Sequence, residues 1–149
     1  MSLFNSINIS SSGLTAERLR MDIISKNIAN ANTTRTANGT PYKRQVVTFK
    51  AAEKESFKTH LNKYVNKNNN NNIGNGVEVT SIKEDQSAFK RVYDPGHPDA
   101  DKKGYVLMPN VNIVTEMINM ISATRSYEAN VTALNSSKSM MMKALEIGR

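Results

Sequence analysis

The chain has 149 residues, no cysteine and a formal net charge of +7 at pH 7. This length fits one domain, or one small domain with extended appendages, and the lack of cysteine excludes disulfides and thiolate catalysis. The apolar share of 38% and the mean hydropathy of -0.51 argue against a large independent core, and no apolar run approaches the roughly 18 residues of a membrane span.

The first predicted element is an amphipathic helix over residues 12–30. Ser12 is expected to cap it, with residues 2–11 either extending the helix or fraying. The polar run ANANTT, which ends at Thr34, is expected to stop it. The opening residues lack a basic segment and a continuous apolar stretch, so no cleaved signal peptide is expected. Three apolar residues of the helix recur seven apart and share one face: Leu14, Met21 and Ile28.

The middle of the chain is predicted to form a small β-rich module. Short strands are indicated by KRQVVTFK, around residues 46–49, and by the alternating valines that follow Gly74 and Gly76. FKRVYDP and YVLMPNVN indicate two more. Residues 50–75 are lysine-rich and include five consecutive asparagines at 68–72, a composition typical of a mobile, solvated loop.

The most regular pattern lies at the C-terminal end, where ten positions alternate spacings of four and three without a break. Eight of the ten are apolar, which predicts a coiled-coil-like helix over residues 113–145. The ten residues of this predicted seam are Ile113, Met117, Met120, Thr124, Tyr127, Val131, Leu134, Lys138, Met141 and Leu145.

A helix of this length needs partners. At about 1.5 Å per residue it is about 50 Å long, whereas the predicted N-terminal helix offers only about 30 Å of facing surface. The alternative is an ordinary core helix, which would explain the apolar pattern if the pattern extended over a single heptad only. A second apolar stripe lies off the seam, so contact with more than one partner is expected: Val114, Ile118, Ile121, Ala129, Ala133, Met140, Met142 and Ala144.

One stretch, YDPGHPDAD, has the residue types of a catalytic or metal site. Asp99, Asp101 and Gly104 match the first, third and sixth positions of a calcium loop. However, Lys103 occupies the fifth position, and Asn110 the twelfth, where a bidentate glutamate is expected. The alternative is a rigid turn set by its two prolines. No P-loop or dinucleotide-binding pattern occurs, so we expect no enzyme activity, no metal and no cofactor.

The basic charge is concentrated in residues 43–67, which contain seven Lys/Arg residues and only two glutamates. Three aromatic residues lie in the same stretch, Phe49, Phe57 and Tyr64, so contacts with phosphate are conceivable. No recognition motif accompanies them, and lysine-rich loops are usually only solvated. A basic module that binds nucleic acid or another anionic surface is therefore the alternative function.

Two segments resemble a known family. SGLTAERLRMDIISKNIANANTTRT, residues 12–36, and the segment 92–149, with VYDPGHPDADKKGYVLMPNVN and RSYEANVTALNSSKSMMMKALEIGR, resemble the flagellar basal-body rod proteins of bacteria, in particular those of the proximal rod. The YDPGHPDAD block is specific to the proximal-rod proteins. The patterns of the terminal helices are shared among rod, hook and filament proteins. Residues 50–75 have no match.

The resemblance implies a structural subunit that leaves the cytoplasm through the flagellar type III export apparatus without a cleaved signal. In such proteins the terminal helices pair into a coiled-coil-like axial domain, and many copies stack helically with other rod proteins into the drive shaft of the basal body. Residues 28–33 would lie where the first helix meets the body of the protein, and residues 113–145 would line the axial core.

The prediction is therefore an α+β protein in three parts: the N-terminal helix at 1–35, the β-rich module at 36–112 and the C-terminal helix at 113–149. The protein would transmit torque as part of the rod, and it would have no small-molecule substrate. The predicted assembly interface comprises Leu14, Met21, Ile28, Ile113, Met117, Met120, Tyr127, Val131, Leu134, Met141 and Leu145.

Overall fold

The computed structural model describes residues 3–52 and 76–147, which form two long helices and four short strands. Most of the predicted mobile loop therefore lies outside the described residues, as does Gly74. The helices are α1, Leu3–Ala29, and α3, Ile113–Ile147. The strands are β1, Gln45–Ala51; β2, Val77–Glu84; β3, Lys90–Tyr93; and β4, Tyr105–Met108.

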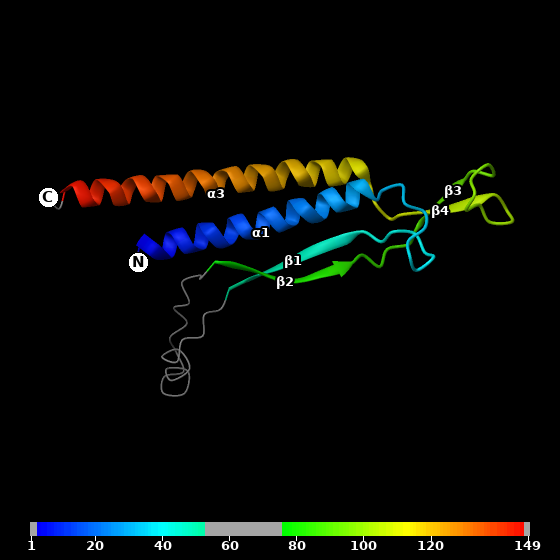
Figure 1. Ribbon diagram of the computed structural model, residues 1–149, viewed down its shortest axis with the longest axis horizontal. Coiled ribbons are helices and arrows are strands. Elements are labelled where there is room, and N and C mark those ends of the chain that lie inside the picture. The colour runs from blue at the N-terminus through cyan, green and yellow to red at the C-terminus, as the bar shows by residue number, and fades with distance from the viewer. Residues whose placement is uncertain (1–2, 53–75, 148–149) are drawn as a thin grey trace, which may run out of the picture.

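The two terminal helices pack against each other lengthwise and antiparallel (Figure 1). Both termini consequently lie at the same end of the molecule. At about 1.5 Å per residue, the 27 residues of α1 span about 40 Å and the 35 residues of α3 about 52 Å. The C-terminal end of α3 therefore extends past the beginning of α1 (Figure 1). The predicted α+β fold with paired terminal helices is confirmed.

The strands form two separate antiparallel hairpins. Strands β1 and β2 pair along their length, with an irregularity between Thr48 and Phe49, and they lie along α1 on the side away from α3 (Figure 1). Strands β3 and β4 form the second hairpin, which projects from the end of the molecule where α1 stops and α3 begins (Figure 1). The mobile loop was predicted to start at residue 50, but Lys50 and Ala51 still belong to β1 and pair with β2.

The predicted helix cap at Ser12 is wrong. The helix α1 begins nine residues earlier, at Leu3, and Ser12 lies within it. Its hydroxyl donates to the carbonyl of Ile9 at 2.7 Å and accepts from the amide of Val77 at 3.0 Å. Gly76 has a φ of 105°, and a Cβ there would come within 2.2 Å of the Ser12 Oγ. The polar side chain thus attaches the start of β2 to α1, which explains why a serine occurs there without capping.

The core is thin, as the composition predicted. Buried apolar residues line the contact between α1 and α3, chiefly Ile23, Ile24 and Ala123. A second group, Ala31, Tyr42 and Val111, packs where α1 ends. None of the helices in the described part of the chain is long and apolar enough to cross a membrane.

Candidate assembly interface

The fully buried side chains of α3 are small or polar, and they are accompanied by half-buried apolar side chains such as Tyr127 and Leu134. The buried residues are Glu116, Ala123 and Ser137, and Ala123 is 0% exposed. Opposite them on α1, a Cβ added at Gly13 would come within 3.0 Å of the Asn130 amide nitrogen. Small residues allow two helices to approach closely, so this contact is narrow and consumes little of the apolar surface of α3.

The structure divides the predicted seam residues between the helix contact and the solvent. Met21 accepts a hydrogen bond at its Sδ from Thr124, 3.6 Å away. Ile113, Met117 and Leu145, in contrast, are 38%, 53% and 72% exposed. Their assignment to an assembly interface stays a prediction. The other predicted interface residues are half-buried: Leu14, Met21, Ile28, Met120, Tyr127, Val131, Leu134 and Met141.

Exposed apolar side chains gather at the two ends of α3. The N-terminal group is Ile113, Val114, Met117, Ile118 and Ile121, and the C-terminal group is Met140, Met142, Leu145 and Ile147. Between residues 122 and 139 no large apolar side chain of the helix is exposed. Contiguous exposed apolar surface in a folded protein marks an interaction site more often than chance. Each end of α3 therefore presents a candidate docking surface.

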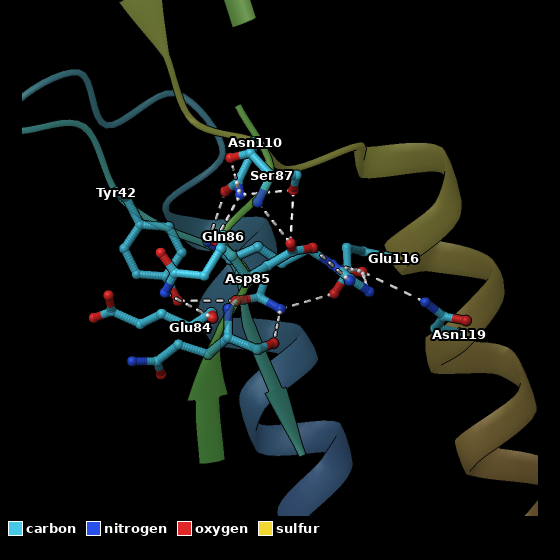
Figure 2. Close-up of polar contacts among 11 residues, drawn as sticks. Tyr42, Glu84, Asp85, Gln86, Ser87, Asn110, Glu116 and Asn119 are labelled. Atoms are coloured by element: carbon cyan, nitrogen blue, oxygen red, sulfur yellow. Dashed lines mark hydrogen bonds and ion pairs between the residues drawn. The ribbon is translucent and has the colours of Figure 1, made fainter. Parts of the chain in front are cut away.

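A polar cluster fixes the junction of helices and strands behind the N-terminal group (Figure 2). Glu116, only 1% exposed, accepts from the Nε and Nη2 of Arg44 at 2.9 and 2.8 Å. Arg44 also reaches Asp85, at 3.4 Å, and its backbone amide donates to Asn110 at 2.8 Å. Charge-assisted bonds of this kind are strong where water is excluded. The cluster ties α3 to the segments before β1 and after β2.

Asn27 completes this junction from α1. Its side-chain nitrogen donates to the Gln45 carbonyl at 2.8 Å and to Glu116 at 2.9 Å. Its oxygen accepts from the Tyr42 hydroxyl and from the Gln45 amide, both at 2.9 Å. A primary amide offers two donors and an acceptor with two lone pairs, and all are used here. Among the other side chains only glutamine carries the same amide group, on a stem that is one methylene longer.

The pKa values of the cluster reflect this environment. Burial raises the pKa of Tyr42, and the charges of Glu116 and Glu84 raise it further. Burial lowers the pKa of Arg44, but hydrogen bonds and charge from Glu116, then Asp85, outweigh it, so the net shift is upward. Hydrogen bonds from the Ser87 side chain and amide lower the pKa of Asp85, with Arg44 adding to the effect. The shifts of Arg44 and Asp85 favour their charged pair, and the shift of Tyr42 favours the neutral phenol that donates to Asn27.

Sequence reasoning missed this cluster, because apolar periodicity does not register polar residues on the buried face of a helix. One signal was available. Glu116 is the acidic residue of the first turn of α3, and Asn112 caps that helix by accepting from the amide of Val114 at 3.1 Å. An acid in the first turn already suggested a defined helix start.

The calcium-like stretch forms a turn that is held by its own residues and by Thr34. Asp99 accepts from the Thr34 hydroxyl at 2.8 Å, and Asp101 accepts from the Lys102 amide at 2.8 Å. Gly104 has a φ of 76°, which glycine adopts without strain. In the described part of the chain, no three His, Cys, Asp or Glu residues are grouped so that they could hold a metal ion. An open cleft of about 930 Å³ beside this turn is lined by both cations and carboxylates.

The cations at the start of the basic stretch are paired. Lys43 lies 3.8 Å from Glu84, Arg44 lies 2.8 Å from Glu116, and Lys50 lies 3.9 Å from Glu78. The rest of the stretch, residues 53–67, lies outside the described residues. The described part therefore offers no row of unpaired cations from this stretch.

Comparison with known proteins identifies the family. Residues 7–35 match the family model described as flagella basal body rod protein, and residues 102–147 match that of the C-terminal region of flagellar basal body rod FlgEFG proteins. The flagellar basal-body rod protein FlgC of Borreliella burgdorferi is 53% identical over 99% of this chain and 98% of its own length. The chain belongs to the FlgC family of flagellar basal-body rod proteins.

Further FlgC proteins match along their whole length. The Bacillus subtilis relative is 51% identical and an Escherichia coli relative 41% identical, each over 100% of both chains. As a FlgC family member, the chain is a structural subunit of the flagellar basal-body rod. The family resemblance inferred from the sequence is thereby confirmed, and the alignments with these relatives span the whole chain.

Proposed function

We propose that the chain is incorporated into the rod through the exposed apolar groups at the two ends of α3, while the α1–α3 pair supplies a stiff axial element. The observation that carries this proposal is the distribution of apolar side chains on α3. Nine large ones are exposed, whereas the face toward α1 buries Glu116, Ala123 and Ser137. Burying apolar surface between subunits is the main favourable contribution to most protein association.

The predicted interface residues take two roles in this proposal. Ile113, Met117 and Leu145 contact neighbouring subunits, since they are exposed in the single chain. The half-buried remainder holds the helix pair together and reaches neighbours only at its edges. Met side chains are adaptable, which suits contacts that differ slightly between positions in a helical array. The neighbours are other rod proteins and copies of this chain.

The test replaces Val114 and Ile118, which are 65% and 62% exposed, by Asp in a flagellated bacterium that lacks its own copy of this subunit. We expect at least a tenfold loss of the subunit from isolated basal bodies, and loss of swimming. Thr132→Asp, in the exposed polar centre of α3, is the matched control and should be retained. Normal incorporation of the double variant would refute the proposal.

Export through the flagellar type III apparatus is part of the same proposal. A thin core and the absence of cysteine suit passage of an unfolded chain. We expect the subunit recovered from basal bodies to retain its N-terminal segment, which intact-mass spectrometry measures. A mass lacking some 15 to 30 N-terminal residues would instead indicate a cleaved secretory signal.

Neither catalysis nor nucleic-acid binding belongs to this proposal. The pairing of Lys43, Arg44 and Lys50 with carboxylates supports that exclusion. Neutralising Lys54, Lys58 and Lys63 together should leave incorporation into basal bodies unchanged. Fluorescence anisotropy with labelled DNA should show only weak binding that vanishes at 0.2 M salt, about the range where non-specific phosphate contacts fade. Tight, salt-resistant binding would favour the alternative function.

A further inference from the structure

Among the described residues, 3–52 and 76–147, no other element covers the C-terminal end of α3. Because α3 is longer than α1, its last turns extend past the helix that covers the rest of it (Figure 1). Met142, Leu145 and Ile147 are 56%, 72% and 85% exposed there. We call these three residues the α3 tip. They lie on different sides of the helix at 100° per residue, so a flat surface could not cover them all and a concave one is needed.

A concave apolar surface occurs at the opposite end of the molecule. It is a groove of about 340 Å³ between the start of α3 and the β3–β4 hairpin, which we call the hairpin groove. Cavities of about 150 Å³ already hold a benzene molecule, so this volume accommodates two branched side chains. Its apolar lining includes Val92, Met108, Val111, Ile113 and Val114.

The electrostatics of the two surfaces are complementary. Lys90 lines the hairpin groove, and among the described residues no carboxylate lies within ion-pair distance of it. The last turn of α3 contains no basic residue, so the partial negative charge of the helix C-terminus is not offset within that turn. A helix end of this kind is attracted to a cation at the rim of an apolar groove.

The two surfaces cannot meet within one chain, because α3 holds them about 50 Å apart. We infer that the α3 tip of one copy inserts into the hairpin groove of a second copy, head to tail. This inference rests on the proposed function and specifies which surfaces pair. The contact is heterologous, since two different patches meet, and an open oligomer keeps one tip and one groove free at its ends. Such contacts generate rings where the rotation between copies closes and open, helical assemblies where it does not.

The absence of cysteine makes a direct test possible, because engineered thiols have no background. Val114→Cys marks the hairpin groove and Ile147→Cys marks the α3 tip. Equal amounts of the two full-length variants are mixed across a wide concentration range and treated with a short bismaleimide crosslinker. We expect the mixture to give covalent dimers at least tenfold more than either variant alone. The double variant should give a ladder of higher oligomers.

Thr132→Cys, in the polar centre of α3, is the matched control and should give only background amounts of dimer when it is mixed with either variant. Lys90→Glu in the double variant should shorten the ladder several-fold, since it places a negative charge at the helix end. Dimers from Val114→Cys alone would show that like patches pair, and this would overturn the head-to-tail contact while leaving association through the ends of α3 intact. Crosslinking no greater than that of Thr132→Cys, in a subunit that still enters basal bodies, would overturn the inference alone.

Discussion

The fully buried residues and the most exposed residues of α3 differ in a way that is unusual for a helix of a globular protein. The inner face of α3 buries a glutamate, an alanine and a serine, Glu116, Ala123 and Ser137. Its outer surface presents large apolar side chains such as Ile118 and Ile147, 62% and 85% exposed. In a monomeric protein the apolar stripe of an amphipathic helix faces the core. Here polar bonds and close approach contribute to the helix contact, while nine large apolar side chains of α3 stay exposed in the single chain.

This difference makes the roles of the two faces separable. Substitutions on the inner face should lower the stability of the single chain, and substitutions on the outer surface should leave it unchanged while reducing association. The unfolding free energy of the purified chain in urea measures the first effect.

The largest loss of stability is expected at Glu116. Replacing it by Ala removes the acceptor of Arg44 and Asn27 and leaves the guanidinium partly buried without its closest partner. Removing one partner of a buried ion pair costs about 3–5 kcal/mol, and urea unfolding should show a decrease in that range. Glu128→Ala, at an exposed position of the same helix, should change stability by less than about 0.5 kcal/mol. Equal effects at the two positions would show that the cluster does not hold the fold.

A smaller loss is expected where the helices approach most closely. Ala123 is 0% exposed, so Ala123→Leu must push α1 and α3 apart. Overpacking of this kind costs about 1–3 kcal/mol, measured again by urea unfolding. Ala129→Leu adds the same side chain to the same helix at an exposed site and should be nearly neutral. A neutral Ala123→Leu would mean that the helix contact is loose.

A pH-dependent effect is expected from Asp85. Its pKa is lowered in the folded state, chiefly by the Ser87 hydrogen bonds, so its carboxylate stabilises the fold above the ordinary aspartate pKa of about 3.9. This contribution is lost as the pH falls through the lowered folded-state pKa. Asp85→Asn should therefore be less stable by about 0.5–1.5 kcal/mol at pH 7, and the difference should shrink below about pH 4. A difference that persists unchanged at pH 2.5 would contradict the assigned cause.

The smallest effect on stability is expected on the outer surface. Ile118→Ser removes an apolar side chain that is 62% exposed, so the unfolding free energy should change by less than about 0.5 kcal/mol. A loss above about 1 kcal/mol would show that Ile118 packs within its own chain.

The existence of both terminal helices, and the length of α3, could be predicted because their apolar residues are periodic. The seam over residues 113–145 and the apolar line of Leu14, Met21 and Ile28 both lie in helices. The spacing of apolar residues could not identify the residues of α3 that are fully buried. The buried positions Glu116, Ala123 and Ser137 each precede a predicted seam residue by one. Close approach and buried hydrogen bonds decide the inner face, and neither leaves an apolar pattern in the sequence.

The extension of α1 over residues 3–11 was one of two alternatives left open, but the cap at Ser12 was wrong and the polar cluster was missed, for a related reason. Ser12 has the residue type of a helix cap, but its hydroxyl bonds to β2, a segment about 65 residues away in the chain. Likewise, Asn27 finds partners at Tyr42, Gln45 and Glu116. Long-range partners of polar side chains depend on the assembled fold, so local sequence rules cannot find them.

The most direct measurement is the reactivity of a single thiol at Ile118→Cys toward a maleimide, in the purified subunit and in isolated basal bodies. Because the chain has no other cysteine, the rate reports this position in this subunit alone. If the outer surface of α3 is buried against neighbouring subunits, labelling in basal bodies should be at least tenfold slower than in the purified chain, and denaturation should restore it. An equal rate in both would mean that this surface remains exposed in the rod, and it would contradict the central claim.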